Sequence, residues 1–346
     1  MRVALSATAL VLAAIVGPAA PAMPPAVREG GGPVPLRGAP LGGETGLRLL
    51  VADKPPFVLD VDSGTVTPLT GVRPQERGTV SIVGVAGRAA VVIARPDWPR
   101  ADLYTVRGRE GRVTAPWSGT DVAPAADGQS VWIKTSASPA RCALRQINLD
   151  GRAMRAPRAF PCASTISSAG SLGLVVNRTR VIDPRTGRTL RRTRWGVLAA
   201  AGHTLVLAGP DDQFTVLDAA TGAQRRLPWP STIGGLDAPA VDPRGRYVAL
   251  AFANPAWRGG PQQALDVWLL DTRTGGLKQL PDMPALVSLK RTSMAWTDDG
   301  RLVLLGARLE TEFVAVWQPG QERLAVKTVQ LPERSDSGSD AFAILR

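Results

Sequence analysis

A short repeated motif constrains the fold of this chain more than any other feature. Four segments share an apolar run, an aspartate, two variable residues, and then a small residue before glycine: residues 58–64, 181–187, 216–222 and 269–275. The aspartate side chain can accept hydrogen bonds from turn amides, and the glycine can take the positive φ of a tight turn. Each copy predicts a β-hairpin, and the recurrence predicts a fold built from one repeated β unit.

A second recurring unit precedes these hairpins. It consists of a short strand of small residues, a polar turn and a strongly apolar strand, as in residues 123–133, 239–250 and 294–305. A turn such as Asp127-Gly128 between apolar runs is a strong hairpin signal. Together the two units predict four antiparallel strands per repeat, named a to d from the inside outwards.

The strand inventory predicts a closed ring. Strand a is expected to begin near Thr79, Asp121, Thr165, Val197, Asp237, Ser293 and Asp340, and strand d near Val113, Met154, Thr189, Arg225, Leu277 and Leu324. The repeat begins with a b strand at residues 47–52 and ends with an a strand at residues 339–345. We therefore predict an all-β fold, a seven-bladed β-propeller of four-stranded antiparallel blades, closed by the C-terminal strand completing the first blade.

The repeats also resemble those of known propellers. Residues 241–249, with Asp242-Pro243-Arg244-Gly245, are similar to the Pro-Asp-Gly strand pair of TolB-type, WD40-like propellers. The Asp-x-x-Thr-Gly turns resemble, more loosely, those of quinoprotein-like propellers. The resemblance covers residues 46–346 and implies the fold. Gly-His occurs once, at Gly202-His203, and the repeated Gly-His and Trp-Asp pairs of true WD40 blades and the adjacent cysteines of quinoprotein dehydrogenases are missing, so the resemblance implies no cofactor.

The N-terminus predicts export. Arg2 precedes an uncharged apolar run over residues 3–17, and Ala20-Pro21-Ala22 offers small residues for cleavage. We interpret residues 1–22 as a signal peptide, which if uncleaved would be a membrane tether. Residues 23–45 are rich in proline and glycine and are expected to form a flexible linker, so that residues 46–346 form the propeller domain. The expected location is secreted or extracytoplasmic, at the cell envelope.

The two cysteines, Cys142 and Cys162, have two interpretations. An exported protein with an even number of cysteines favours a disulfide, and the alternative is a pair of buried thiols.

The net charge of +12 is carried mainly by arginine, since only five lysines are present. Together with the abundance of alanine, glycine and proline, this indicates a compositional bias, and we do not expect a nucleic-acid partner. The runs Arg191-Arg192-Thr193-Arg194 and Arg225-Arg226 fall on predicted outer strands. Charge at such edges opposes edge-to-edge aggregation, and we favour that interpretation over a polyanion site.

Few residues point to catalysis. The single histidine, His203, lies in a predicted turn, which excludes a multi-histidine metal site, and no nucleophile-elbow motif is present. Carboxylates at the starts of inner strands, Asp121, Asp237 and Asp340, would line the central channel and act as acid and base or bind a cation. The alternative is that they accept hydrogen bonds from backbone amides. We predict no metal and no cofactor.

The loops between strands b and c form the predicted binding face. They carry tryptophan and arginine, which are hot-spot residues at interfaces, and the alternative is that the tryptophans pack across neighbouring blades. The candidates are Trp98, Arg100, Asp211, Asp212, Trp257 and Arg258. We therefore predict a non-enzymatic binding or scaffold module at the cell envelope, with an unidentified protein or glycan as partner. The alternative function is a carboxylate-based hydrolase or lyase with its site in the channel.

Overall fold

The computed structural model describes residues 34–72, 79–85, 89–95, 101–138, 140–209, 213–230, 239–259, 262–332 and 342–346. Within these residues the regular structure is β-strand, apart from one short 3-10 helix, η1 (Gly170–Leu172). No helix in the described part of the chain is long and apolar enough to cross a membrane.

The strands form antiparallel four-stranded units, which we call blades and number along the chain. Blade 1 consists of β31 (Phe342–Leu345), β3 (Arg48–Val51), β4 (Phe57–Asp60) and β5 (Val66–Pro68). Blade 2 consists of β6 (Thr79–Val85), β7 (Ala89–Arg95), β8 (Ala101–Arg107) and two short outer strands, β9 (Arg112–Val113) and β10 (Trp117–Gly119). Blade 3 consists of β11 (Asp121–Pro124), β12 (Ser130–Ser138), β13 (Arg141–Asn148) and β14 (Arg158–Phe160). In blade 2, both β9 and β10 pair with β8.

Blades 4 and 5 are also separate sheets. They consist of β15 (Ile166–Ser168), β16 (Leu174–Val176), β17 (Arg180–Ile182) and β18 (Thr189–Arg192); and β19 (Gly196–Ala201), β20 (Thr204–Ala208), β21 (Gln213–Asp218) and β22 (Gln224–Pro228).

Blades 6 and 7 are joined in one larger sheet. They consist of β23 (Ala240–Val241), β24 (Tyr247–Gly259), β25 (Gln262–Asp271) and β26 (Leu277–Gln279); and β27 (Ala285–Trp296), β28 (Leu302–Arg308), β29 (Thr311–Trp317) and β30 (Ala325–Val329). The connection arises because β27 begins at Ala285, well before the predicted start near Ser293, and its first residues pair with Gln263, Ala264 and Leu265 of β25.

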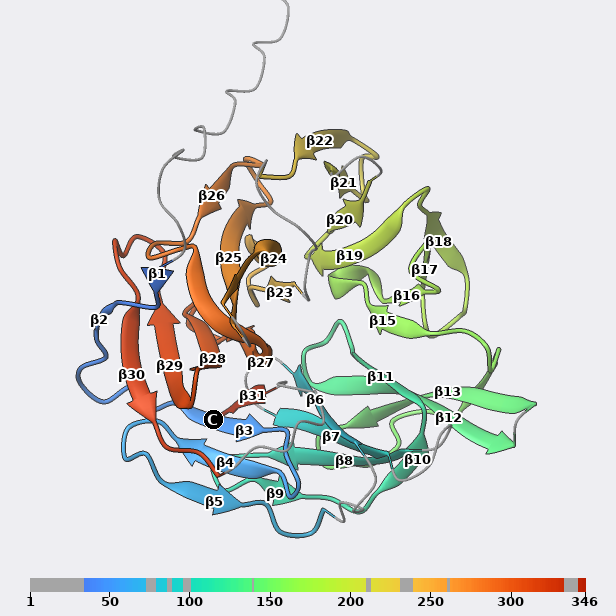
Figure 1. Cartoon of the computed structure of the whole chain (residues 1–346). Coiled ribbons are helices and arrows are strands. Elements are labelled where there is room, and N and C mark those ends of the chain that lie inside the picture. Colours follow the sequence, from blue (N-terminus) through green and yellow to red (C-terminus); the bar gives the residue numbers. More distant parts are fainter. Residues whose placement is uncertain are drawn as a thin grey trace, which may run out of the picture.

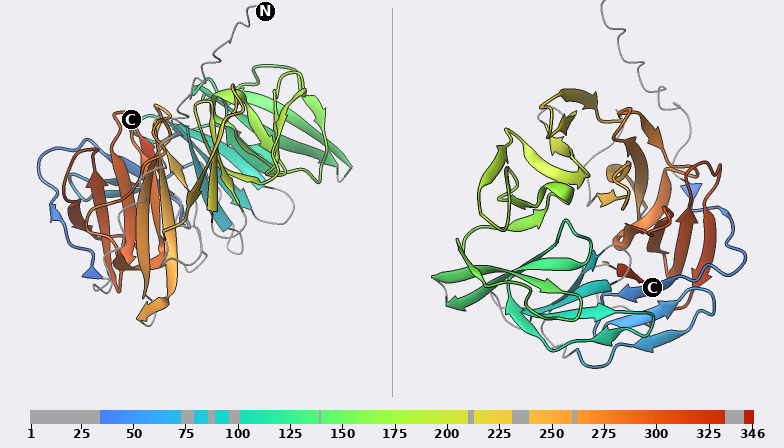
Figure 2. Two further views of the ribbon diagram at one scale, coloured as in Figure 1. Left: turned by 90° about the horizontal axis from the view of Figure 1, so that it is seen from above. Right: turned by 180° about the vertical axis from the view of Figure 1, so that it is seen from behind.

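The blades form a ring around a common centre (Figure 1). The inner strands are in contact in the order β6, β11, β15, β19, β23, β27 and β31, with η1 contributing between β15 and β19, and β31 contacts β6 again. Figure 2 shows the same arrangement from above and from behind.

Apolar packing follows the same ring. The buried hydrophobic residues fall into seven clusters, each of which joins two neighbouring blades. The cluster with Leu49 and Val303 joins blades 7 and 1, for example, and the cluster with Trp132 and Leu174 joins blades 3 and 4. Seven interfaces in a closed cycle correspond to the seven predicted units, and burial between faces is what stabilises a ring of sheets.

The ring is closed by the two ends of the chain, as predicted. β31 pairs antiparallel with β3, with Arg48 opposite Leu345 and Val51 opposite Phe342. The C-terminal strand therefore completes blade 1 from the inside.

The predicted hairpin turns are confirmed. At Asp218 the carboxylate accepts hydrogen bonds from the amides of Ala220 and Thr221 at 2.8 and 2.9 Å, and Gly222 has a φ of 79°. The bonds from Thr221 and Ala220 lower the pKa of the Asp218 carboxyl. One strand prediction is wrong: the outer strand of blade 3 lies at β14, because near Met154 only an isolated bridge between Ile147 and Ala153 forms.

Arginines on several blades reach over the turns of the next blade. Arg158 Nη1 donates to Pro184 O at 3.5 Å, Arg225 Nη1 donates to Thr274 O, and Arg48 Nη1 donates to Arg109 O at 3.0 Å. The outer-strand positions predicted for Arg191-Arg192 and Arg225-Arg226 are confirmed in β18 and β22.

The segment before β3 lies against blade 7. β1 (Val34–Pro35) pairs parallel with β27, and β2 (Ala39–Pro40) pairs parallel with β30. A Cβ at Gly38 would lie 2.6 Å from a methyl group of Val326, so the close approach requires glycine. The predicted linker over residues 23–45 is thus described from Val34 onwards and carries two short strands.

Candidate functional site

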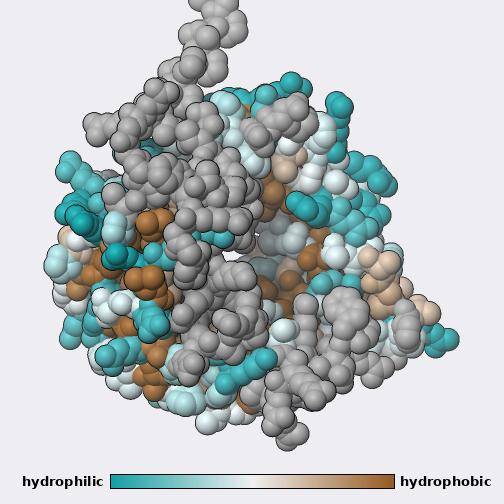
Figure 3. All heavy atoms as spheres, in the orientation of Figure 1, coloured by the Kyte–Doolittle hydropathy of each residue, from teal (hydrophilic) through white to brown (hydrophobic). Residues whose placement is uncertain are grey.

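A cavity of about 970 Å³ occupies the centre of the ring. Figure 3 shows the face of the molecule that is seen in Figure 1. This face is hollowed near its middle, with apolar residues on part of the wall of the hollow. All seven inner strands contribute to the lining, including Gly84, Ala199 and Ala343. Small side chains on strands that converge towards one axis leave space that larger ones would fill, which explains why the cavity exists.

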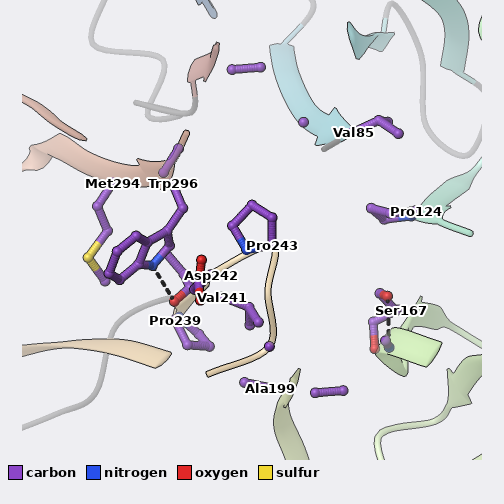
Figure 4. Close-up of a pocket in the computed structure, with 18 of the residues that line it drawn as sticks. Val85, Pro124, Ser167, Ala199, Pro239, Val241, Asp242, Pro243, Met294 and Trp296 are labelled. Atoms are coloured by element: carbon purple, nitrogen blue, oxygen red, sulfur yellow. Dashed lines mark hydrogen bonds between the residues drawn. The ribbon is translucent and has the colours of Figure 1, made fainter. Parts of the chain in front are cut away.

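One wall of the cavity is aromatic and apolar. In Figure 4, Trp296 and Met294 lie on one side, and Val85, Pro124 and Ser167 lie on the other. Trp296 is fixed in place because its Nε1 donates to Ala240 O at 3.1 Å and Tyr247 stacks on its ring with centroids 6.3 Å apart. Such a rigid indole can hold an apolar part of a ligand.

Asp242 is the buried charged residue of the lining, with 3% of its surface exposed. Its Oδ2 accepts a long hydrogen bond from the Arg246 amide at 3.4 Å, while Oδ1 has no hydrogen-bond partner among the described residues. A buried carboxylate oxygen without a donor is costly. The aspartate was part of the TolB-like repeat in the sequence, but its placement at the cavity follows only from the ring.

The turns between the first and second strands of the blades surround one end of the cavity. They contribute Gly128, Gly170, Gly202 and Gly245 to the lining. Gly245 has a φ of 69°, and a Cβ there would lie 2.8 Å from Gly202 N, so blades 5 and 6 can approach only because both turns lack side chains. The binding face predicted from the sequence lies on the other set of loops, and these turns gave no signal because small turn residues carry no chemical signature.

The predicted channel carboxylates are only partly described. Asp121 lies in β11, and its Oδ2 is 2.7 Å from Nζ of the buried Lys134, which also donates to Ser164 O at 2.6 Å. The cavity wall of blade 3 is formed by other residues, among them Pro124 and Ala125. Asp237 and Asp340 lie outside the described residues, so the clustering of the three stays a prediction.

The residues predicted for the binding loops are also only partly described. Trp98, Arg100, Asp211 and Asp212 lie outside the described residues. Trp257 and Arg258 belong to β24, where Arg258 is opposite Gln263, but their side chains are not among those described. Their role in binding stays a prediction.

Two further predicted features can be located. Cys142 and Cys162 form a disulfide, with Cα atoms 5.1 Å apart, which ties the start of β13 to the segment after β14. His203 lies exposed in the turn between β19 and β20, as predicted. Among the described residues, no group of three or more histidine, cysteine, aspartate or glutamate side chains is arranged to hold a metal ion.

Comparison with known proteins gives matches at the level of structure. No family model and no curated protein sequence matches the chain. TolB from Acinetobacter baumannii is 13% identical, with 88% of this chain and 68% of that chain covered and a TM-score of 0.47. A protein from Lactobacillus plantarum is 14% identical, with 87% and 99% covered and a TM-score of 0.49. A chain of a mitotic checkpoint complex is 16% identical, with 96% and 100% covered and a TM-score of 0.48.

These likenesses extend over most of the chain and concern the fold alone. TolB is also one of the propeller types that the repeats in the sequence resemble. No function is transferred from any of the three proteins.

Proposed function

We propose that this protein is an exported binding module whose ligand occupies the central cavity of the propeller. The cavity carries this proposal: about 970 Å³ of space, apolar on the side of Trp296 and Met294, with the buried carboxylate of Asp242, whose Oδ1 has no partner in the described part of the chain, in its lining. Largely apolar cavities with a few polar groups that fix orientation are typical ligand sites. A ligand with an apolar body and one hydrogen-bond donor or positive charge would match these groups.

The proposed location outside the cytoplasm has two supports. The first is the signal-peptide pattern of residues 1–22, and the second is the Cys142–Cys162 disulfide. Disulfides persist mainly in oxidising compartments. The predicted loop face with Trp98 and Trp257 would then recruit a protein or glycan partner at the envelope, beside the cavity ligand.

Blocking the cavity tests the proposal. Ser167 lines the cavity and is exposed, so Ser167→Trp would place an indole in the space without displacing core residues, whereas Ser118→Trp places the same indole at an exposed position of β10. Wild type and both variants would be screened against arrays of short peptides and glycans. We expect ligands that Ser118→Trp retains and Ser167→Trp loses. Binding that survives Ser167→Trp in every case would contradict a ligand site in the cavity.

The alternative function, a carboxylate-based hydrolase or lyase, has one observation in its favour, the buried Asp242 carboxylate at the cavity. Acid–base hydrolysis of this kind needs a second carboxylate. Asp237 and Asp340 are the candidates from the sequence. If a glycoside panel gives turnover that Asp242→Asn abolishes while ligand binding persists, the protein is an enzyme and the binding-module proposal is wrong.

A further inference from the structure

Positive charge is concentrated on blade 4. Residues 164–195 contain seven arginines and one aspartate, a net charge of +6, which is half of the +12 of the whole chain. Three of these arginines lie in or beside turns. Arg185 and Arg188 belong to the turn that follows Asp183, and Arg191 packs near Gly222 in a turn of blade 5. The remaining four lie together at the other end of the blade.

Two of the four form a rung of like charge. Arg180 of β17 is directly opposite Arg192 of β18. Opposite residues on antiparallel strands project from the same face with Cβ atoms about 5 Å apart, and like charges in this position are destabilising. The Cβ atoms of Arg180 and Arg192 therefore lie close together on one face of the blade.

The other two arginines, Arg178 and Arg194, lie at the same end of blade 4, just beyond the paired strands. Thr193 N donates to Thr179 O at 2.8 Å and Val197 N donates to Arg178 O at 2.6 Å, so the two strands stay together beyond the rung. The Arg194 guanidinium lies 4.7 Å from the centroid of the Trp195 ring. A Cβ on Gly196 would lie 3.4 Å from Arg178 Nε. Both side chains thus flank residues 195 and 196.

Arg178 occupies a position that favours glycine. Asn177 and Arg178 have φ values of 50° and 62° in the tight turn between β16 and β17. Asn-Gly is the favoured pair in turns of this kind, and a residue with a Cβ there costs about 1 kcal/mol. The backbone is therefore strained at Arg178, which lies at the same end of blade 4 as Arg180, Arg192 and Arg194.

No carboxylate neutralises the cluster within the described part of the chain. The ion pairs there involve other basic residues, such as Arg48 with Asp60 at 3.2 Å, Lys134 with Asp121 at 2.7 Å and Arg246 with Asp271 at 3.2 Å. Repulsion within the rung and the absence of an internal counter-charge both favour an external anion.

We propose that Arg178, Arg180, Arg192 and Arg194 form a binding site for a ligand with consecutive phosphate groups. A guanidinium binds phosphate through two parallel hydrogen bonds, which lysine cannot reproduce. Arg178 lies just before β17 and Arg194 just after β18, at the same end of blade 4 as the Arg180–Arg192 rung, so the rung and the Arg178–Arg194 pair would each hold one phosphate of a short chain. This site is separate from the cavity and does not depend on the function proposed above.

Calorimetric titration with sodium tripolyphosphate at low salt tests the proposal, with orthophosphate and anionic phospholipid vesicles as further arms. We expect tripolyphosphate to bind more tightly than orthophosphate and Arg180→Gln/Arg192→Gln to weaken it about tenfold or more, since each charged hydrogen bond contributes roughly 1.5–3 kcal/mol. The matched control, Arg185→Gln/Arg188→Gln, removes the same charge from the opposite end of blade 4 and should change the affinity less than threefold.

Stability measurements separate loss of the site from loss of the fold. Because removing Arg180 and Arg192 relieves repulsion, the unliganded variant should melt at the same or a higher temperature than wild type, while losing the increase that tripolyphosphate gives wild type. Equal losses in both double variants, or no binding by wild type, would overturn the proposal. If wild type binds the vesicles and Arg180→Gln/Arg192→Gln does not, lipid headgroups are a source of the phosphates. If wild type binds tripolyphosphate but not the vesicles, the ligand is a soluble phosphate chain.

Discussion

Leu49 of β3 lies opposite Ile344 of β31, although the two residues stand near opposite ends of the chain. Both are buried, and they belong to the cluster that joins blades 7 and 1. In a ring, loss of this pairing exposes edges on both sides of the gap. We expect Ile344→Ala to lower the free energy of unfolding by about 2–4 kcal/mol and deletion of residues 342–346 to abolish a single cooperative transition.

Denaturation in urea measures both effects. The control is Leu309→Ala, because Leu309 is 59% exposed and should change the stability by less than about 0.5 kcal/mol. A truncated protein that melts like wild type would show that β31 does not close the ring.

The arginine contacts between blades predict unequal costs for two similar glycines. Gly64 and Gly275 both end an Asp-x-x-(Ser/Thr)-Gly turn, with φ values of 74° and 65°. A Cβ on Gly64 meets nothing within 4 Å, whereas one on Gly275 would overlap the Arg225 guanidinium. Gly64→Ala should cost about 1 kcal/mol from backbone strain alone, and Gly275→Ala about 1 kcal/mol more.

A double-mutant cycle isolates the contact. In an Arg225→Ala background, Gly275→Ala should cost no more than Gly64→Ala does in wild type. If the extra cost persists without the arginine, the packing of Arg225 over the turn does not explain it.

The disulfide predicts a redox-dependent stability. Cys142 and Cys162 are separated by 20 residues, and a cross-link of that span stabilises a fold by about 3 kcal/mol in the chain-entropy model. Reductant should therefore lower the melting temperature of wild type. The double variant Cys142→Ser/Cys162→Ser should melt lower from the start and be insensitive to reductant. Equal sensitivity of the two proteins would assign the effect to something other than this bond.

The sequence was sufficient for the repeat because the repeat depends on local chemistry. The turn at Asp218 requires a hydrogen-bond acceptor and a glycine at fixed spacing, and both residues can be recognised directly in the amino-acid sequence. Ring closure was also predictable, since an unmatched strand at each end can pair only with the other. The outer strand of blade 3 was not, because the segment around Met154 satisfies the pattern of a strand while its neighbours provide no continuous ladder.

The candidate site was largely beyond the sequence. Ala199 and Gly84 line the cavity through small size alone, and small residues carry no sign of which face they occupy. Asp242 is an ordinary turn aspartate in the sequence, and neither its burial nor the lack of a donor for its Oδ1 among the described residues can be read from the residue letters. The opposition of Arg180 and Arg192 depends on the register of β17 and β18, which is set across the turn over residues 183–188 and a bulge between Val181 and Ile182, and the arginine-rich composition does not reveal that register.

Asp266 predicts a pH dependence of stability with a definite sign. It is buried in β25, opposite Phe252, and accepts a hydrogen bond from Gln279 Nε2 at 3.0 Å. Burial raises the pKa of the Asp266 carboxyl, and the hydrogen bond from Gln279 offsets this only in part. The folded protein therefore binds this proton more tightly than the unfolded chain, so the contribution is full below the unfolded pKa of about 3.9 and is lost as the pH rises through the higher folded pKa.

Asp266→Asn keeps the acceptor for Gln279 and cannot ionise, so its stability relative to wild type should increase from acid to neutral pH. Each unit by which the pKa is raised corresponds to about 1.4 kcal/mol. Asp62→Asn is the control of opposite sign: burial would raise the pKa of Asp62, but hydrogen bonds from Thr45 and Gly46 outweigh it and lower the pKa, so this variant should lose stability relative to wild type over the same range. Urea denaturation across that range measures both differences, and a difference for Asp266→Asn that stays constant with pH would show that Asp266 titrates alike in the folded and unfolded chains.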